Sequence, residues 1–312
     1  MLVRLLFSFF LSLILFGCSE QLTFVPGGMG DPKTTDISLI DSSYIVSKRH
    51  GIDISKPVIM VVHGYTASTF EWSEFSDYAD GRGDTPLKGV YVSSVLLGGH
   101  GRSLDSFRKT SWKDWSEPII SEYNALVSLG FRSINIVGAS TGGTLILDLL
   151  AEEAFSQSLN SVVFVDSLVH PRSKLLALVP YIYPFVKDIR NEAASDEKKK
   201  YWYTINPKEG MRELAVLIKL IQNKLEIGIV LPAKTVCQIF QASNDPVVDP
   251  QSAISIYDGI RLHDGSKPVV SMLESDLHVF TRLRARDKEA VTQFDKSLQH
   301  NVFEQIITLA KQ

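Results

Sequence analysis

The chain has 312 residues, of which 45% are hydrophobic and 21% charged, with 32 basic residues against 35 acidic ones. This hydrophobicity, at a formal net charge of −3, excludes a disordered chain, and a pI near 6.2 argues against a nucleic-acid partner. Two cysteines cannot build a disulfide scaffold in a chain of this length. These counts predict a globular body of enzyme size with a substantial core.

The N-terminal residues predict an export signal. Arg4 precedes an apolar run at residues 5–16, which is too short to cross a bilayer as a helix. Leu15-Phe16-Gly17-Cys18 then resembles the bacterial lipoprotein signal, in which the cysteine is lipidated. We therefore expect a signal peptide at residues 1–17 and a lipid anchor on Cys18, with an ordinary signal peptide as the alternative. This resemblance implies a cell-envelope location, at the outer membrane if the source is Gram-negative.

Residues 18–35 are expected to form a tether, because polar residues are followed by the closely spaced turn formers of residues 26–32. If Cys18 carries lipid, Cys237 is left without a disulfide partner. Cys237 lies in an apolar run, so we expect a buried free thiol that packs as a small hydrophobic side chain.

Short, continuous runs of apolar residues are typical of strands buried on both faces of a sheet. Six of them occur, at residues 57–62, 90–97, 134–137, 161–165, 236–240 and 268–273. Helical patterns lie between them. One covers 111–129, opening at a serine and closing before Gly130, and others cover 144–154 and 288–310. The alternation predicts an α/β fold with a doubly wound, mostly parallel sheet.

One segment interrupts this alternation. Residues 167–234 contain no clear strand run, but apolar residues recur at helical spacing between Leu214 and Leu225. We interpret this segment as a helical cap inserted over the carboxyl edge of the sheet, with additional core helices as the alternative. The predicted α/β core then comprises residues 36–166 and 235–312.

The strongest motif joins a strand to a helix at Gly138-Ala139-Ser140-Thr141-Gly142. A hydroxyl that points out of the end of a strand requires a sharp turn, which places the serine in a strained conformation. Glycines two residues away on each side let strand and helix approach each other. Ser140 would also lie at a helix N-terminus, where free amides favour negative charge. The pattern predicts a nucleophilic serine.

Four further motifs follow strand ends: 61–65 (Val-Val-His-Gly-Tyr), 98–103 (Gly-Gly-His-Gly-Arg-Ser), 241–248 (Gln-Ala-Ser-Asn-Asp-Pro-Val-Val) and 274–279 (Glu-Ser-Asp-Leu-His-Val). With the Gly-x-Ser-x-Gly turn, they make the chain resemble the α/β-hydrolases, nearest to the esterase and monoacylglycerol-lipase-like branch with a helical cap. The resemblance extends from about residue 57 to the C-terminus.

This resemblance implies a catalytic triad in the order serine, acid, histidine. Ser140 would be the nucleophile, Asp245 the acid with Asp249 as runner-up, and His278 the base. Three of the seven histidines follow the carboxyl end of a predicted strand, where open α/β sheets hold their ligands. We expect two of these, His63 and His100, to be structural, which leaves His278 as the base.

The resemblance also implies two backbone N–H donors for an oxyanion, those of Tyr65 and Thr141. The expected activity is hydrolysis of a carboxylic ester with a short or medium acyl chain, or of a monoacylglycerol, without metal or organic cofactor. An acyltransferase or thioesterase would use the same triad, and a noncatalytic surface lipoprotein that binds a ligand is a further alternative. The expected partners are a small-molecule or lipid ester and, through the N-terminal anchor, a membrane.

Overall fold

The structure is a computed structural model that describes residues 28, 29, 31, 44–80, 88–156, 158–190, 195–286 and 291–312. The predicted signal peptide and Cys18 lie outside the described residues, as does most of the predicted tether. Within the part of the chain that is described, no helix combines the length and apolarity needed to cross a bilayer.

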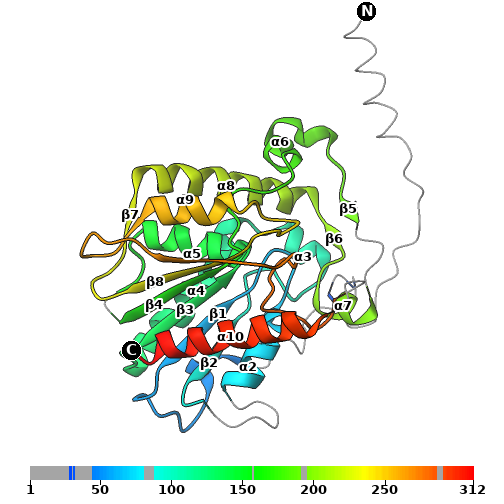
Figure 1. Cartoon of the computed structure of the whole chain (residues 1–312). Helices are drawn as coiled ribbons and strands as arrows, with labels where there is room; N and C mark the ends of the chain where they lie inside the picture. Colours follow the sequence, from blue (N-terminus) through cyan, green and yellow to red (C-terminus); the bar gives the residue numbers. More distant parts are fainter. Residues whose placement is uncertain are drawn as a thin grey trace, which may run out of the picture.

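Six parallel strands form the central sheet, in the order β10-β8-β4-β3-β1-β2 (Figure 1). All six apolar runs of the sequence are strands, and the predicted parallel α/β fold is confirmed. Their bounds are β1 Val58–Val62, β2 Tyr91–Val95, β3 Ile134–Ala139, β4 Leu159–Val165, β8 Val236–Ala242 and β10 Val269–Leu273. The expectation of burial on both faces holds for β1 and β3 but is wrong for β10, which is an edge strand with partly exposed residues.

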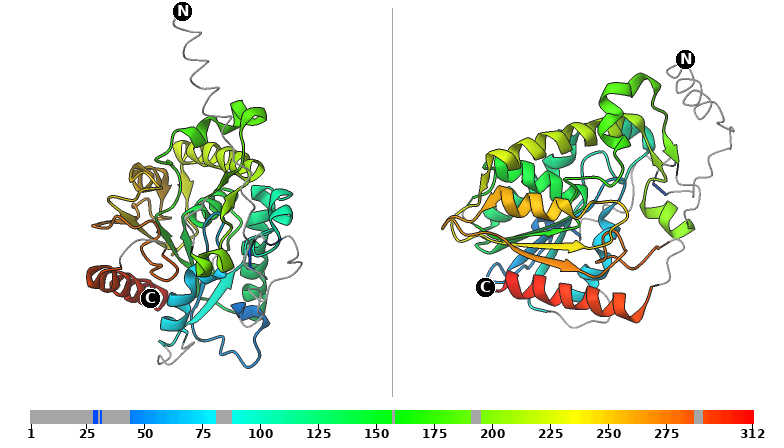
Figure 2. Two further views of the ribbon diagram at one scale, coloured as in Figure 1. Left: turned by 90° about the vertical axis from the view of Figure 1, so that its right-hand side faces the viewer. Right: turned by 45° about the horizontal axis from the view of Figure 1, so that its top comes forward.

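Helices cover both faces of this sheet (Figures 1 and 2). One face carries α4 Trp112–Leu129, α5 Thr141–Ala151, α8 Lys208–Ile227 and α9 Gln251–Gly259, and the other carries α2 Ser73–Ala79 and α10 Gln293–Ala310. Successive residues of β1 serve the two cores in turn. Val58, Met60 and Val62 belong to the first core, whereas Ile59 and Val61 belong to the second, as the two-residue period of a strand requires.

The helix ends follow local sequence signals. α4 begins with a capping box, in which Asp114 accepts hydrogen bonds from the backbone and side chain of Ser111, and it ends at Gly130 with a φ of 97°. α10 begins at a second capping box, made by Thr292 and Asp295, and continues without interruption to Ala310. Before α4 the chain also forms the short helices η2 Val46–Lys48, η3 Thr69–Trp72 and α3 Leu104–Arg108.

The segment between β4 and β8 is mostly helical, as expected. It contains α6 Leu175–Ile182, η4 Tyr183–Phe185, β5 Ile189–Arg190, α7 Asp196–Tyr201, β6 Ile205–Asn206, α8 and β7 Ile229–Val230. β5 pairs with β6, and β7 pairs with β9 Ile260–Arg261. α8 packs against α6 within the inserted segment and against α5 and α9, so it lies over the helices that cover the sheet. The boundaries of a separate cap domain stay a prediction.

The strand order reverses direction at one place. From β1 the chain moves outward to β2, then returns to β3 on the other side of β1 and continues to β4, β8 and β10. The loops that leave β1 and β3 therefore diverge at their carboxyl ends. Ligands of open α/β sheets bind in the crevice that such a switch creates.

Candidate active site

Ser140 lies in the turn between β3 and α5, at the switch in strand order. Its φ of 49° and ψ of −121° are strained for a residue with a side chain, as the sequence predicts. The close approach of strand and helix explains the flanking glycine, because a Cβ on Gly142 would lie 2.5 Å from the carbonyl oxygen of Val62. The turn thus aims the Ser140 hydroxyl outward from the sheet's carboxyl edge.

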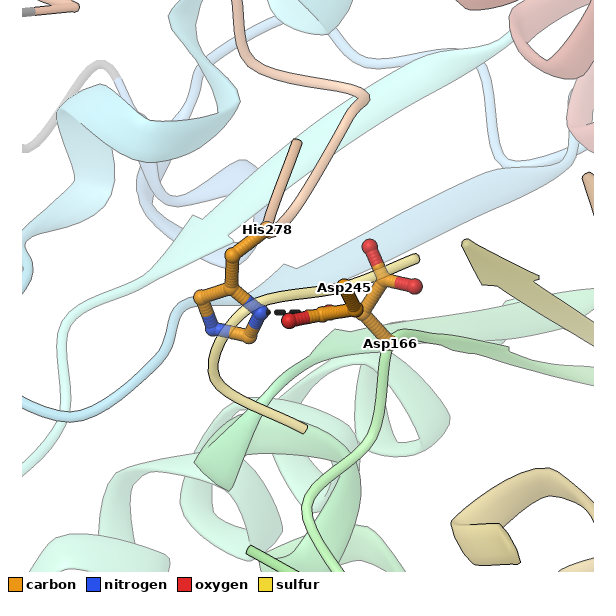
Figure 3. A group of neighbouring side chains, drawn as sticks. All are labelled: Asp166, Asp245 and His278. Atoms are coloured by element: carbon orange, nitrogen blue, oxygen red, sulfur yellow. Dashed lines mark hydrogen bonds and ion pairs between the residues drawn. The ribbon is translucent and has the colours of Figure 1, made fainter. Parts of the chain in front are cut away.

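Three loops bring Ser140, His278 and Asp245 together. The Ser140 Oγ lies 3.1 Å from His278 Nε2, and His278 Nδ1 lies 2.8 Å from Asp245 Oδ2 (the latter contact is drawn in Figure 3). Asp245 is fully buried, and its Oδ1 accepts hydrogen bonds from the N–H groups of Val247 at 2.7 Å and Val248 at 2.9 Å. These bonds fix the carboxylate so that its other oxygen faces the imidazole.

Asp249, the alternative acid of the sequence analysis, lies elsewhere. Its Oδ1 accepts a hydrogen bond from the Gln251 N–H at 2.9 Å, at the start of α9. This is a turn-forming role, typical of an aspartate just before a helix. The structure therefore places Asp245, and not Asp249, against the imidazole.

The pKa of the His278 imidazole is raised above its ordinary value. Burial by itself lowers this pKa, but the hydrogen bond to Asp245 and the charges of Asp245, Asp166 and Glu71 outweigh burial. The three carboxyl groups thus favour the imidazolium. A histidine held in this way can accept a proton from a neighbouring hydroxyl at a smaller energetic cost.

The amides of Tyr65 and Thr141 lie in the loops that flank Ser140. Within the described chain, neither amide donates a hydrogen bond to a protein acceptor. Thr141 is the first residue of α5, where an N–H has no partner inside the helix. The β1 loop approaches closely, since a Cβ on Gly64 would lie 3.0 Å from the Ser140 Cβ. Both amides therefore remain available beside the hydroxyl.

His63 and His100 take structural positions, as the sequence analysis expects. His63 Nε2 accepts the Leu97 N–H at 3.1 Å, and burial lowers the pKa of His63 to about 4, which keeps the ring neutral. His100 packs edge-on against Phe107 and Trp115. These rings hold the loops after β1 and β2 and do not reach Ser140 by any recorded hydrogen bond of the described residues.

Two buried carboxyl groups at the site, those of Glu71 and Asp166, were not predicted from the sequence. The Glu71 Oε1 accepts the Gly64 N–H at 2.7 Å, which secures the loop that carries the Tyr65 amide. Burial raises the pKa of Glu71, although the Arg282 guanidinium opposes this. Asp166 follows β4 and lies against Asp245 and His278. A polar residue directly after an apolar strand was a signal for Asp166, whereas no motif marks Glu71.

An apolar cavity of about 640 Å³ opens at Ser140 and His278. Its wall comes largely from the inserted segment, with Leu175, Leu176, Val179 and Ile182 of α6 and Met211 and Leu214 of α8. Sites for small molecules are typically concave and mainly apolar, with few polar groups that set orientation. Here the polar lining residues are Ser140, Thr141 and His278, together with Thr66, Ser173 and Asn206.

Asp166, Asp245 and His278 are the one group of described residues whose ligand-type atoms, all within 4.8 Å of one another, resemble a metal site. However, Asp245 Oδ1 and Asp166 Oδ1 each accept backbone N–H groups, and both His278 nitrogens face hydrogen-bonding partners. Because these atoms are already paired, the group is better suited to proton transfer than to metal binding.

No family model matches the chain, but similarity to individual known proteins is found. A carboxylesterase of Bacillus subtilis (strain 168) is 24% identical over 232 residues, which cover 73% of this chain and 87% of the relative. A metagenome-derived lipolytic enzyme superposes with a TM-score of 0.63 at 18% identity, covering 81% of this chain and 93% of that one.

A soluble variant of monoglyceride lipase from Saccharomyces cerevisiae, solved with a substrate analogue, gives a TM-score of 0.61 at 12% identity. This match covers 84% of our chain and 88% of the yeast chain. At such identities the solved structures establish the fold alone. The chain has the α/β-hydrolase fold, with a strand order and a serine turn that agree with it.

Proposed function

We propose that this protein is a serine hydrolase that cleaves carboxylic esters, with Ser140 as nucleophile, His278 as general base and Asp245 as the acid. The observation that carries the proposal is the hydrogen-bonded line from Ser140 Oγ through the His278 imidazole to Asp245, at the floor of an apolar cavity. The sequence relationship to a carboxylesterase supports the same class of reaction.

The proposed reaction begins when His278 Nε2 takes the proton of the Ser140 hydroxyl. The Ser140 Oγ forms a bond to the ester carbonyl carbon, and the carbonyl oxygen becomes an oxyanion. Asp245 holds the Nδ1–H tautomer and stabilises the imidazolium. The carbon–oxygen bond to the alcohol then breaks, and the alcohol oxygen takes the proton from Nε2. Water repeats these steps on the acyl-enzyme and releases the acid and the serine.

The Tyr65 and Thr141 amides would bind the oxyanion. Both flank Ser140, and both are without a protein acceptor in the described part of the chain. Donors that are already oriented require no rearrangement when the charge forms, and loss of one such donor typically costs about 3 kcal/mol of transition-state stabilisation. The hydrogen bond between Gly64 and Glu71 keeps the first of these amides in its loop.

The cavity supports an ester with a short or medium acyl chain, or a monoacylglycerol, as substrate. A volume of about 640 Å³ with aliphatic walls accommodates an acyl chain, and the yeast structural relative is a monoglyceride lipase. α6 lines this cavity and also exposes large apolar side chains, with Leu175 exposed by 64% and Tyr181 by 84%. An exposed apolar helix at the cavity is consistent with an amphiphilic substrate.

The N-terminal pattern supports attachment to a membrane. The apolar run at residues 5–16 and the abrupt polar switch after Cys18 are the basis for a lipid-anchored protein of the cell envelope. Metabolic labelling with a palmitate analogue, compared between the wild type and Cys18→Ala, tests this part. Label that persists in Cys18→Ala would contradict the anchor.

Activity is tested with p-nitrophenyl esters of increasing chain length and with a fluorophosphonate probe. We expect hydrolysis and labelling at Ser140, both lost in Ser140→Ala and retained in Ser128→Ala, a surface serine of α4. A folded wild type that neither hydrolyses an ester nor takes the probe would favour the noncatalytic alternative. Product analysis with an added alcohol or a thioester would distinguish hydrolysis of oxygen esters from acyl transfer and thioesterase activity.

A further inference from the structure

Asp166 occupies an unusual place beside the proposed triad. It directly follows β4, whose neighbour in the sheet is β8, the strand that leads to Asp245. Its backbone N–H continues the ladder to the Phe240 carbonyl at 3.0 Å, and its φ of 44° then turns the chain. Its side chain is fully buried next to Asp245 (Figure 3). A buried carboxyl group in a strained turn costs folding free energy, which points to a role that offsets this cost.

The hydrogen bonds of Asp166 join the two turns that carry Asp245 and His278. Its Oδ1 accepts the Ala242 N–H at 2.7 Å and the Gln241 Nε2 at 3.1 Å, both at the end of β8. Its Oδ2 accepts the Phe280 N–H at 3.4 Å, two residues beyond His278. One side chain thus links the end of β4, the acid turn and the histidine loop.

Asp166 also adds charge to the site. A carboxyl oxygen of Asp166, one of Asp245 and a ring nitrogen of His278 all lie within 4.8 Å of one another. Burial, and next the charge of Asp245, raise the pKa of Asp166 to about 7, whereas the His278 charge and the amides of Ala242 and Phe280 lower it. Two carboxyl groups so close do not readily ionise together unless a cation forms between them. The imidazolium of the proposed reaction is such a cation.

We propose that Asp166 is a positioning residue for His278 and a second acid that partly replaces Asp245 when Asp245 is removed. This inference rests on the proposed hydrolase function. The hydrogen bonds of Asp166 to the Asp245 turn and to the His278 loop keep the imidazole aligned with Ser140. The additional carboxylate stabilises the imidazolium while the oxyanion exists. A merely structural Asp166 would serve the backbone donors alone, and asparagine would replace it without a kinetic effect.

The test compares Asp166→Asn, Asp245→Asn and the double variant with the wild type in p-nitrophenyl butyrate hydrolysis. Asp249→Asn is the matched control, because Asp249 lies in the turn before α9, where its Oδ1 accepts the Gln251 N–H and not a ring N–H of His278. For Asp166→Asn we expect kcat to fall about 10-fold to 100-fold with KM nearly unchanged, as for an interaction made in the transition state. For Asp245→Asn we expect a loss well below the roughly 10⁴-fold typical of a triad without its acid, and a further loss of at least about 10-fold in the double variant.

The pH profile provides a readout that a structural role would not move. The carboxyl groups that raise the pKa of His278 are Asp245, Asp166 and Glu71, so removal of one of them should shift the acidic limb of kcat/KM to lower pH. Equal activities of Asp245→Asn and the double variant, or an Asp166→Asn enzyme with the kcat and pH profile of the wild type, would overturn the inference.

If Asp166→Asn does not fold, Asp245→Asn alone decides. A loss in Asp245→Asn of no more than about 100-fold relative to the wild type supports the second acid, and a loss of roughly 10⁴-fold or more refutes it. These outcomes are separate from failure of the proposed function, which would appear as a folded wild type without hydrolysis or fluorophosphonate labelling.

Discussion

Replacement of Glu71 by glutamine tests how the loop after β1 is held beside Ser140. The Glu71 side chain is buried, and its Oε1 accepts the Gly64 N–H at 2.7 Å. Tyr65, the next residue, carries one of the two proposed oxyanion amides. Glutamine retains the volume and an oxygen acceptor but removes the negative charge. The substitution therefore weakens the hydrogen bond without opening a cavity.

The expected magnitude follows from the strength of that bond. A hydrogen bond to a charged group contributes about 1.5–3 kcal/mol and a neutral one about 0.5–1.5 kcal/mol, so the change should cost about 1–2 kcal/mol. If this whole free-energy cost raises the energy of the transition state, kcat falls by about 5-fold to 30-fold. KM should change little, because the Tyr65 amide is needed chiefly when the oxyanion has formed.

The assay is steady-state hydrolysis of p-nitrophenyl butyrate by Glu71→Gln, with Glu226→Gln as an exposed control on α8. Melting temperatures recorded in parallel separate a loss of fold from a loss of transition-state binding. A variant with unchanged kcat and a raised KM would refute the reasoning. So would a variant whose lower activity disappears once the unfolded fraction is subtracted.

Three other outcomes are expected. Because a general base must be neutral and the pKa of His278 is raised above its usual 6.5, kcat/KM should fall as the pH drops through a midpoint above 6.5, and a midpoint well below that value would contradict the pKa shift. Gly142→Ala should lower the urea midpoint by an amount corresponding to about 1–3 kcal/mol or more, because the new Cβ would lie 2.5 Å from the Val62 carbonyl oxygen. A midpoint equal to that of the wild type would show that the backbone of the turn shifts to accommodate the methyl group. Burial raises the pKa of Cys237, so iodoacetamide should label this thiol only after urea unfolding, and rapid labelling of the folded protein would show that it is accessible.

Patterns along the chain were sufficient to predict the sheet and its strands. Strands that are covered by helices on both faces require continuous apolar runs, and each of the six runs is a strand of the sheet. Local chemistry likewise predicted the start of α4 at Ser111 and its end at Gly130. The strands of two residues, β5, β6, β7 and β9, escaped prediction because two residues define no period.

The Gly-x-Ser-x-Gly turn is also local, which is why its strained serine was predictable from five residues. The partners of Ser140 are not local, since Asp245 and His278 follow other strands. A strand's end can be predicted from sequence, whereas distances between side chains on three different loops depend on how the sheet is assembled. The sequence left Asp245 and Asp249 as alternatives, and the contact of Asp245 with His278 appears only in the fold.

The sequence alone determined the fold class, the serine turn and the candidates for the acid and the base, because these depend on apolar periodicity and on turn residues. Only the tertiary structure decided that Asp166 and Glu71 lie next to the imidazole and the loop beside Ser140. Glu71 belongs to no local motif, and Asp166 is marked only by its place directly after an apolar strand. Asp166 has a carboxyl oxygen within 4.8 Å of a His278 ring nitrogen, and Glu71 accepts the Gly64 N–H at 2.7 Å, across loops that only the assembled sheet brings together.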